Sequence, residues 1–167
     1  MPSVCRPSTI MKVLACRGEY EPASFVVKTE GTLRRVRVDV GPLTGPSGSL
    51  EADAVDVRVV QLLFRRVTDW PALAPALLLH DADLIVVDEK PQPQALVDGA
   101  HPAHQAYTHT NRLTREAVDT AELQPVDIDD CRQFWITVHV PESCTSGTYT
   151  ARVTIRPENA AATELTL

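Results

Sequence analysis

The strongest constraint on the fold is the alternation of apolar and polar residues in two runs near the C-terminal end, at residues 133–140 and 149–155. Alternation with a period of two residues is typical of β-strands that bury one face. Because a loop containing Pro141 and Gly147 joins the runs, they are predicted to pair as an antiparallel hairpin. The buried faces are expected to carry Phe134, Ile136, Val138 and Val140 in the first run, and Tyr149, Ala151, Val153 and Ile155 in the second.

Similar runs occupy much of the remaining chain. They lie at residues 9–15, 21–28, 33–40, 54–64, 82–87 and from 163 onward, and residues 41–48 are dense in turn formers. No long stretch has the apolar spacing of a helix. The 167 residues therefore predict one domain. Its expected fold is an all-β antiparallel sandwich of about eight strands, immunoglobulin-like or of jelly-roll type, with a long irregular insertion at about residues 89–123.

Charge and hydropathy exclude two classes of partner. The net charge of −6 and the scattered basic residues argue against binding to nucleic acid. No run approaches the ~20 apolar residues needed to cross a bilayer, so no membrane insertion is expected. The first residues lack the charged and apolar regions of a secretory leader, so no signal peptide is expected within this sequence.

The four cysteines are Cys5, Cys16, Cys131 and Cys144. They form no CxxC pair, which argues against a structural zinc site. Cys16 and Cys131 each precede a predicted strand, so one hypothesis places them at the same end of the sandwich, joined by a disulfide. The favoured interpretation is that the cysteines are buried or partly buried free thiols.

Two groups of polar residues are candidates for metal binding. His101, His104 and His109 lie in the predicted insertion and could ligate a metal, although histidines in a polar loop are usually solvated. Residues 80–83 hold a histidine and two aspartates that could supply oxygen ligands to calcium. An aspartate that caps a turn is the favoured interpretation of this second group, and no cofactor is expected.

No constellation of residues predicts catalysis. Glu19 and Glu21 could act as an acid–base pair, but ion pairing with Arg17 and Arg132 at a sheet end is the favoured interpretation. Cys131 and His139 lie on one predicted strand, more than about 20 Å apart at ~3.3 Å per residue, which excludes a nucleophile–base pair.

Three aromatic residues are candidates for contact with a carbohydrate or a partner protein: Trp70, Trp135 and Tyr107. Trp135 lies on the face of its strand opposite Phe134. It marks a central strand if it is buried, and a contact surface if it is exposed. A carbohydrate-binding module usually presents several exposed aromatic side chains, and only 5% of this chain is aromatic.

Residues 17–27, Arg-Gly-Glu-Tyr-Glu-Pro-Ala-Ser-Phe-Val-Val, resemble the GE-x-EP-x-SF opening of N-terminal β-sandwich domains in bacterial glycoside-hydrolase-like proteins. These proteins include relatives of the exo-acting N-acetylgalactosaminidases. Stretches at residues 57–60, 77–84, 123–125, 133–138 and 147–149 follow in the matching order. The resemblance implies a non-catalytic accessory domain that packs on a neighbouring catalytic (β/α) barrel. It also implies an extracellular or periplasmic location, and it assigns no catalytic residue because the family's catalytic acids lie in the barrel.

Two alternatives to the accessory domain remain open. The first is a self-assembling structural or adhesive protein, in which the C-terminal strand or the long insertion pairs with an identical subunit by strand addition. The second is a carbohydrate-binding module whose partner is a glycan.

Overall fold

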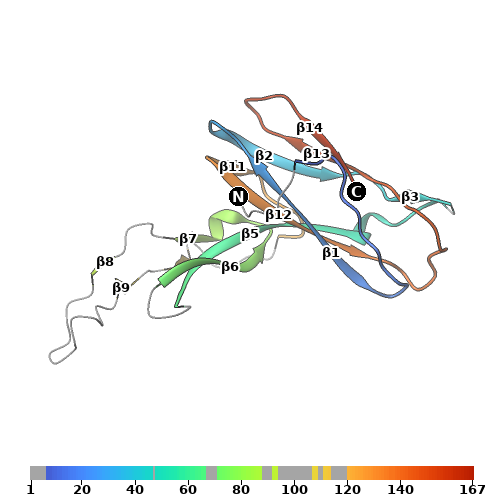
Figure 1. The fold of residues 1–167 in the computed structure, drawn as a ribbon, viewed down its shortest axis with the longest axis horizontal. Helices are drawn as coiled ribbons and strands as arrows, with labels where there is room; N and C mark the ends of the chain where they lie inside the picture. Colours follow the sequence, from blue (N-terminus) through green and yellow to red (C-terminus); the bar gives the residue numbers. More distant parts are fainter. Residues whose placement is uncertain are drawn as a thin grey trace.

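The computed structural model describes residues 7–46, 48–66, 71–87, 92–93, 107–108, 111–113 and 120–167. Two four-stranded antiparallel sheets dominate it, one in the order β1-β12-β5-β6 and the other in the order β11-β2-β13-β14 (Figure 1). We call them the first and the second sheet. Their apolar faces supply the two core clusters, which confirms the predicted all-β sandwich.

The first sheet contains β1 (Tyr20–Lys28), β12 (Cys131–His139), β5 (Val55–Arg66) and β6 (Pro71–Leu79). The second sheet contains β11 (Val126–Ile128), β2 (Leu33–Val40), β13 (Arg152–Arg156) and β14 (Thr163–Thr166). The smaller elements are β3 (Thr44–Gly45), β4 (Gly48–Ser49), η1 (Ala52–Ala54), η2 (Ala82–Leu84), β7 (Ile85–Val87), β8 (Gln92–Pro93), β9 (Tyr107–Thr108) and β10 (Asn111–Leu113).

The predicted pairing of the two C-terminal runs is wrong. Strand β12 lies between β1 and β5 in the first sheet, whereas β13 lies between β2 and β14 in the second. The chain between them crosses from one sheet to the other. An alternating sequence specifies a strand with one buried face, and that face is the same whether the next strand lies beside it or across the core.

The predicted buried faces are confirmed. Phe134, Ile136 and Val138 of β12 are 0%, 0% and 6% exposed. Ile136 and Val138 pack in one core cluster with residues of β13, and Phe134 packs in the other. The buried apolar residues of β13 and the segment before it are Ala151, Val153 and Ile155.

The segment at residues 7–16, which we call the N-terminal arm, was predicted to hold a strand at residues 9–15. The alternation is present, since Met11, Val13 and Ala15 are half-buried and the residues between them are exposed. The arm nevertheless makes only an isolated parallel bridge, between Ile10 and Thr166. Its apolar residues Met11 and Val13 pack on the core cluster shared by β12 and β13.

A β-bulge interrupts the pairing of β2 with β11. Arg35 has a φ of 45°, in the left-handed region that non-glycine residues rarely adopt. Side chains replace the lost ladder bonds: Asp127 Oδ1 accepts the Arg35 N–H at 2.7 Å, and Asn159 Oδ1 accepts the Arg34 N–H at 2.8 Å. The bond from the Arg35 backbone and the Arg34 guanidinium hold the pKa of Asp127 below its usual value.

The turn-rich segment at residues 41–48 contains the β3–β4 hairpin, which lies against the loop before β13. Gly45 faces the ring of Tyr149, and Gly147 faces the ring of Pro46. Each glycine therefore leaves room for a ring from the other loop. This reciprocal contact explains why Gly147 and Tyr149 occur together in the stretch at residues 147–149.

Three other segments differ in detail from their predictions. The run at residues 82–87 splits into η2 and the short β7, and β6 lies at residues 71–79, where no strand was predicted. Within the predicted insertion, β8 pairs with β9 and β10 pairs with β7, and most of its other residues lie outside the described part. The described part contains no helix long and apolar enough to cross a membrane.

Candidate interaction face

The outer face of the first sheet is the most distinctive surface in the described part of the chain. The strand register places Trp135 between Ser24 of β1 and Arg58 of β5. We call the outward residues of this sheet the Trp135 face. They are Tyr20, Pro22, Ser24, Val26, Asp56, Arg58, Val60, Leu78, Gln133, Trp135, Thr137 and His139, and His80, directly after β6, joins them through its bond to Asp56.

The exposure of Trp135 decides whether its strand is central to the sheet or presents a contact surface. The side chain is half-buried on the outer face, directly opposite the fully buried Phe134 side of β12. It is therefore neither a core residue nor freely solvated. Strand β12 is central to its sheet and also presents an aromatic residue outward, a combination typical of contact surfaces.

Further aromatic and apolar groups surround Trp135. Tyr20 is 67% exposed, and its ring stacks on His139 with centroids 4.2 Å apart and planes at 11°. Across the sheet, Leu78 is 37% exposed and lies opposite Val60, which is 5% exposed. Exposed aromatic or apolar side chains therefore lie on both β1 and β6, while Val60 between Trp135 and Leu78 is itself buried.

A polar cluster lies beside Trp135. The two carboxylate oxygens of Asp56 bond to different groups: Oδ1 to His80 Nε2 at 2.6 Å and Oδ2 to Arg58 Nε at 2.6 Å. Burial raises the pKa of Asp56, but the hydrogen bonds and charges of His80 and Arg58 outweigh it, and the pKa lies below its usual value. The carboxylate thus holds both partners in place on the face.

Replacing Asp56 with asparagine is expected to lower the unfolding free energy by about 1 kcal/mol at neutral pH, a value discounted for partial exposure. Because folding lowers the pKa of Asp56, the ionised carboxylate stabilises the fold above its unfolded pKa of about 3.9. That stabilisation disappears as the pH falls through the lower folded value. Urea denaturation of wild type and variant should therefore give free energies that converge below about pH 4.

Asp53 in the neighbouring η1 is exposed, so Asp53→Asn serves as the matched control. A difference for Asp56→Asn that is as large at about pH 3 as at about pH 7 would contradict this account of the cluster.

The outer face of the second sheet has a different character. It carries exposed ion pairs between neighbouring strands, among them Arg152 with Glu164 at 3.3 Å and Arg156 with Asp39 at 3.5 Å. Their side chains are 55–71% exposed. Exposed pairs of this kind contribute little to stability and keep a face hydrated. The second sheet therefore presents a solvated surface, whereas the first presents the Trp135 face.

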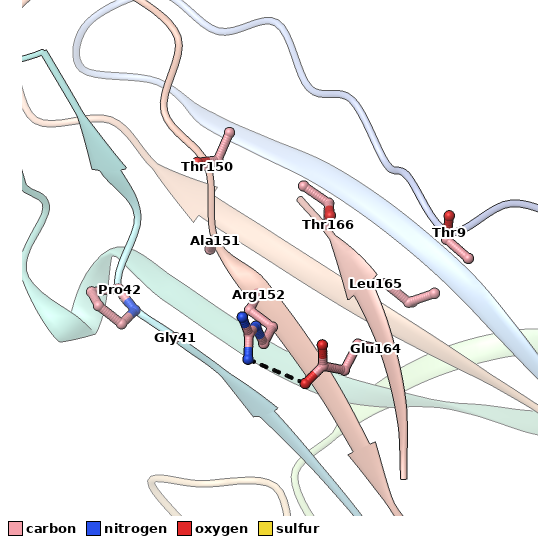
Figure 2. A pocket seen from close by; sticks show the side chains of 9 residues that line it. All are labelled: Thr9, Gly41, Pro42, Thr150, Ala151, Arg152, Glu164, Leu165 and Thr166. Atoms are coloured by element: carbon pink, nitrogen blue, oxygen red, sulfur yellow. Dashed lines mark hydrogen bonds and ion pairs between the residues drawn. The ribbon is translucent and has the colours of Figure 1, made fainter.

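A pocket lies where the arm meets the second sheet (Figure 2). Arg152 and Glu164, its charged lining residues, are exposed and already paired with each other. This lining offers no group poised for chemistry among the described residues. The pocket residues are Thr9, Gly41, Pro42, Thr150, Ala151, Arg152, Glu164, Leu165 and Thr166.

Several candidates from the sequence fall outside the part that can be described. Trp70, His101, His104 and His109 lie outside the described residues, and the side chain of Tyr107 is not described. No group of three metal-ligating side chains occurs in the described part. The capped-turn interpretation of residues 80–83 is confirmed, because Asp81 Oδ1 accepts the Asp83 N–H at 2.9 Å at the start of η2.

The hypothesis of a Cys16–Cys131 disulfide is contradicted, and the favoured free-thiol interpretation agrees with the structure. Both thiols are free. Cys131 begins β12 opposite Lys28, whereas Cys16 lies near the other end, where Gly18 N–H donates to the Val140 carbonyl. The eight residue steps of β12 separate the two ends by about 26 Å. Residues that precede two antiparallel neighbours lie at opposite ends, and the prediction overlooked this. His139 ends β12 and is far from Cys131 for the same reason.

The predicted ion pairs at the glutamates are also wrong. Arg132 lies opposite Val27, at the far end of β1 from Glu21, and its guanidinium donates to Gln61. Glu19 accepts the Cys16 N–H at 2.7 Å and so stabilises the turn before β1. Sequence reasoning also missed the Tyr20–His139 stack and the bonds of Asp56. The alternation of the predicted strands indicated that these side chains point outward. Which of them contact each other depends on strand order.

The fold and the face together define an all-β sandwich domain with a candidate interaction surface on one sheet. Comparison with protein-family models gives no match, and comparison with curated proteins gives none. A solved structure of a family 123 glycoside hydrolase from Clostridium perfringens, described in connection with glycolipid glycan hydrolysis, is similar with a TM-score of 0.57 at 9% identity. The match covers 91% of this chain and 21% of that one, so this chain spans about a fifth of its length. At this identity the likeness shows the fold alone.

Proposed function

We propose that this chain is a non-catalytic accessory domain that packs on a neighbouring catalytic domain of glycoside-hydrolase type through the Trp135 face. The observation that carries the proposal is the contrast between the two outer faces. One sheet is covered by exposed ion pairs, and the other presents Trp135, the Tyr20–His139 stack and Leu78. The fold likeness to a much longer glycoside hydrolase supports the class of neighbour.

The dimensions and chemistry of the face suit such a role. Strand β12 has nine residues and lies in a sheet of four strands, which gives about 500 Å² at ~3.3 Å per residue and ~4.8 Å between strands. That is more than half of the ~800 Å² that each partner contributes to a standard interface. Trp, Tyr and Arg are the residue types that most often dominate binding energy, and Trp135, Tyr20 and Arg58 lie on this face.

The proposal is tested on the complete reading frame that encodes this chain. Hydrogen exchange is measured on the complete protein and on the isolated chain, and glycosidase activity is assayed in both. We expect activity in the complete protein only, and slower exchange in β1, β5 and β12 when the neighbouring domain is present. In the complete protein, Trp135→Ala should lower the denaturant concentration at which the two domains separate. Arg156→Ala, on the solvated face, is the matched control and should leave this concentration unchanged.

Three results would overturn the proposal. They are a complete protein without a glycosidase domain, protection confined to the second sheet, and equal effects of the Trp135 and Arg156 variants. Glycan binding by the isolated chain that is lost in Trp135→Ala would instead assign the Trp135 face to a carbohydrate.

A further inference from the structure

The N-terminal arm lies beside the edge strand β14 of the second sheet. It is bonded to the free edge of β14, where Thr166 N–H donates to Thr9 O and Met11 N–H donates to Thr166 O, both at 2.8 Å. Figure 2 shows Thr9 on the arm beside Thr166 and Leu165. Met11 and Val13 insert their side chains against the core cluster shared by β12 and β13. The arm is thus an extended segment that runs beside β14 and packs two side chains on the core.

Few polar contacts tie the arm to its own domain. In the described part these are the two backbone bonds to β14 and a turn at residues 16–19, in which Cys16 N–H donates to Glu19 Oε2 at 2.7 Å and Glu19 N–H donates to Cys16 O at 3.4 Å. The turn depends on Gly18, whose φ is 79°. The arm also exposes two large apolar side chains, Ile10 at 56% and Leu14 at 95%. Exposure of Leu14 beside the turn has no stabilising role in a closed monomer.

We propose that residues 7–16 exchange between two copies of this chain. In the exchanged dimer the turn at residues 16–19 opens, and each arm packs Met11 and Val13 on the core cluster of the other copy and bonds to its β14. The structure itself identifies the occupant of this site, because the same segment already makes these contacts in the closed form. Exchange of an identical element keeps these contacts and is a low-cost route to a two-fold dimer. The opened hinges then run past each other, which covers Leu14. This inference does not depend on the proposed function.

Paired cysteines distinguish the closed form from the exchanged one. Ile10 and Thr166 are bridge partners, at a backbone spacing that a disulfide can span. The test chain carries Ile10→Cys and Thr166→Cys, with Cys5, Cys16, Cys131 and Cys144 replaced by serine. It is refolded at several concentrations and treated with oxidised glutathione, so that two protein thiols form one disulfide and release two molecules of reduced glutathione. A closed chain gives a covalent monomer, and an exchanged pair gives a covalent dimer.

We expect the covalent dimer to rise from below about a tenth to above about half of the protein over about a hundredfold range of concentration. Covalent monomer alone at every concentration would overturn the proposal. So would a dimer in light scattering whose crosslink is intrachain, because that dimer uses another surface. If no crosslink forms, residue 10 does not lie beside residue 166, and the proposal is overturned as well.

The hinge supplies a second, independent readout. Gly18→Val strains the closed turn but not an extended hinge, so the midpoint concentration for the covalent dimer should fall at least about fivefold. Gly31→Val is the matched control, because no atom lies within 4 Å of a Cβ at Gly31. Equal midpoints for the two variants would overturn exchange through this turn.

Discussion

Replacing Phe134 with alanine is expected to lower the unfolding free energy by about 3–5 kcal/mol, the usual cost of removing a buried aromatic ring. Phe134 is 0% exposed, and its ring stacks on Phe25 with centroids 5.3 Å apart. It also belongs to the core cluster formed with Val36, Ile128 and Ile155 of the second sheet. The ring therefore joins the two layers, and the cavity left by its removal has rigid strands on both sides.

The measurement is urea denaturation, with the midpoint and the slope recorded for each variant. Trp135→Ala on the same strand is the matched control, since Trp135 is half-buried and on the outer face. Its cost in the isolated chain should stay below about half of that for Phe134→Ala. Equal costs would show that the Trp135 face is core rather than contact surface, and would remove the basis of the proposed docking.

Replacing Gly45 with alanine is expected to cost about 1–3 kcal/mol, as overpacking at a close contact does. A Cβ at Gly45 would overlap the Tyr149 ring, 2.6 Å from its Cε1 atom. The β3–β4 hairpin would have to move away from the loop before β13. Since Pro46 also covers Gly147, both halves of the contact should loosen together.

Thermal or urea unfolding of Gly45→Ala, Gly31→Ala and the double variant Gly45→Ala with Tyr149→Leu tests this contact. Gly31→Ala should be nearly neutral, because a Cβ there meets no atom within 4 Å. The double variant should cost less than the sum of its single changes, because the smaller side chain removes the overlap. Additive costs would mean that the two loops do not depend on each other.

The predicted architecture depended on local patterns and is correct where local patterns suffice. Alternation located β1, β2, β5, β12 and β13 and identified the buried residues of β12 and β13.

The errors share one physical cause, which is that they concern strand order. The hairpin of β12 with β13, the Cys16–Cys131 disulfide and the pairing of Glu21 with Arg132 all required a choice of neighbour. A strand with one apolar face can pair with any strand that continues the sheet and its apolar face. Polar loops between the strands allow several strand orders. Strand order is therefore decided by how the two sheets pack together around their shared core.

The alternation around Trp135 thus determined by itself that residues 133–140 form a strand with Phe134 on its buried face, because backbone geometry sends neighbouring side chains to opposite faces. Tertiary structure alone decided what Trp135 meets. Placing β12 between β1 and β5 brings Ser24, Arg58 and the Asp56–His80 pair beside it, from positions 55 to 111 residues away in the chain. Contacts across such separations form only when the sheet assembles, so no local pattern encodes them.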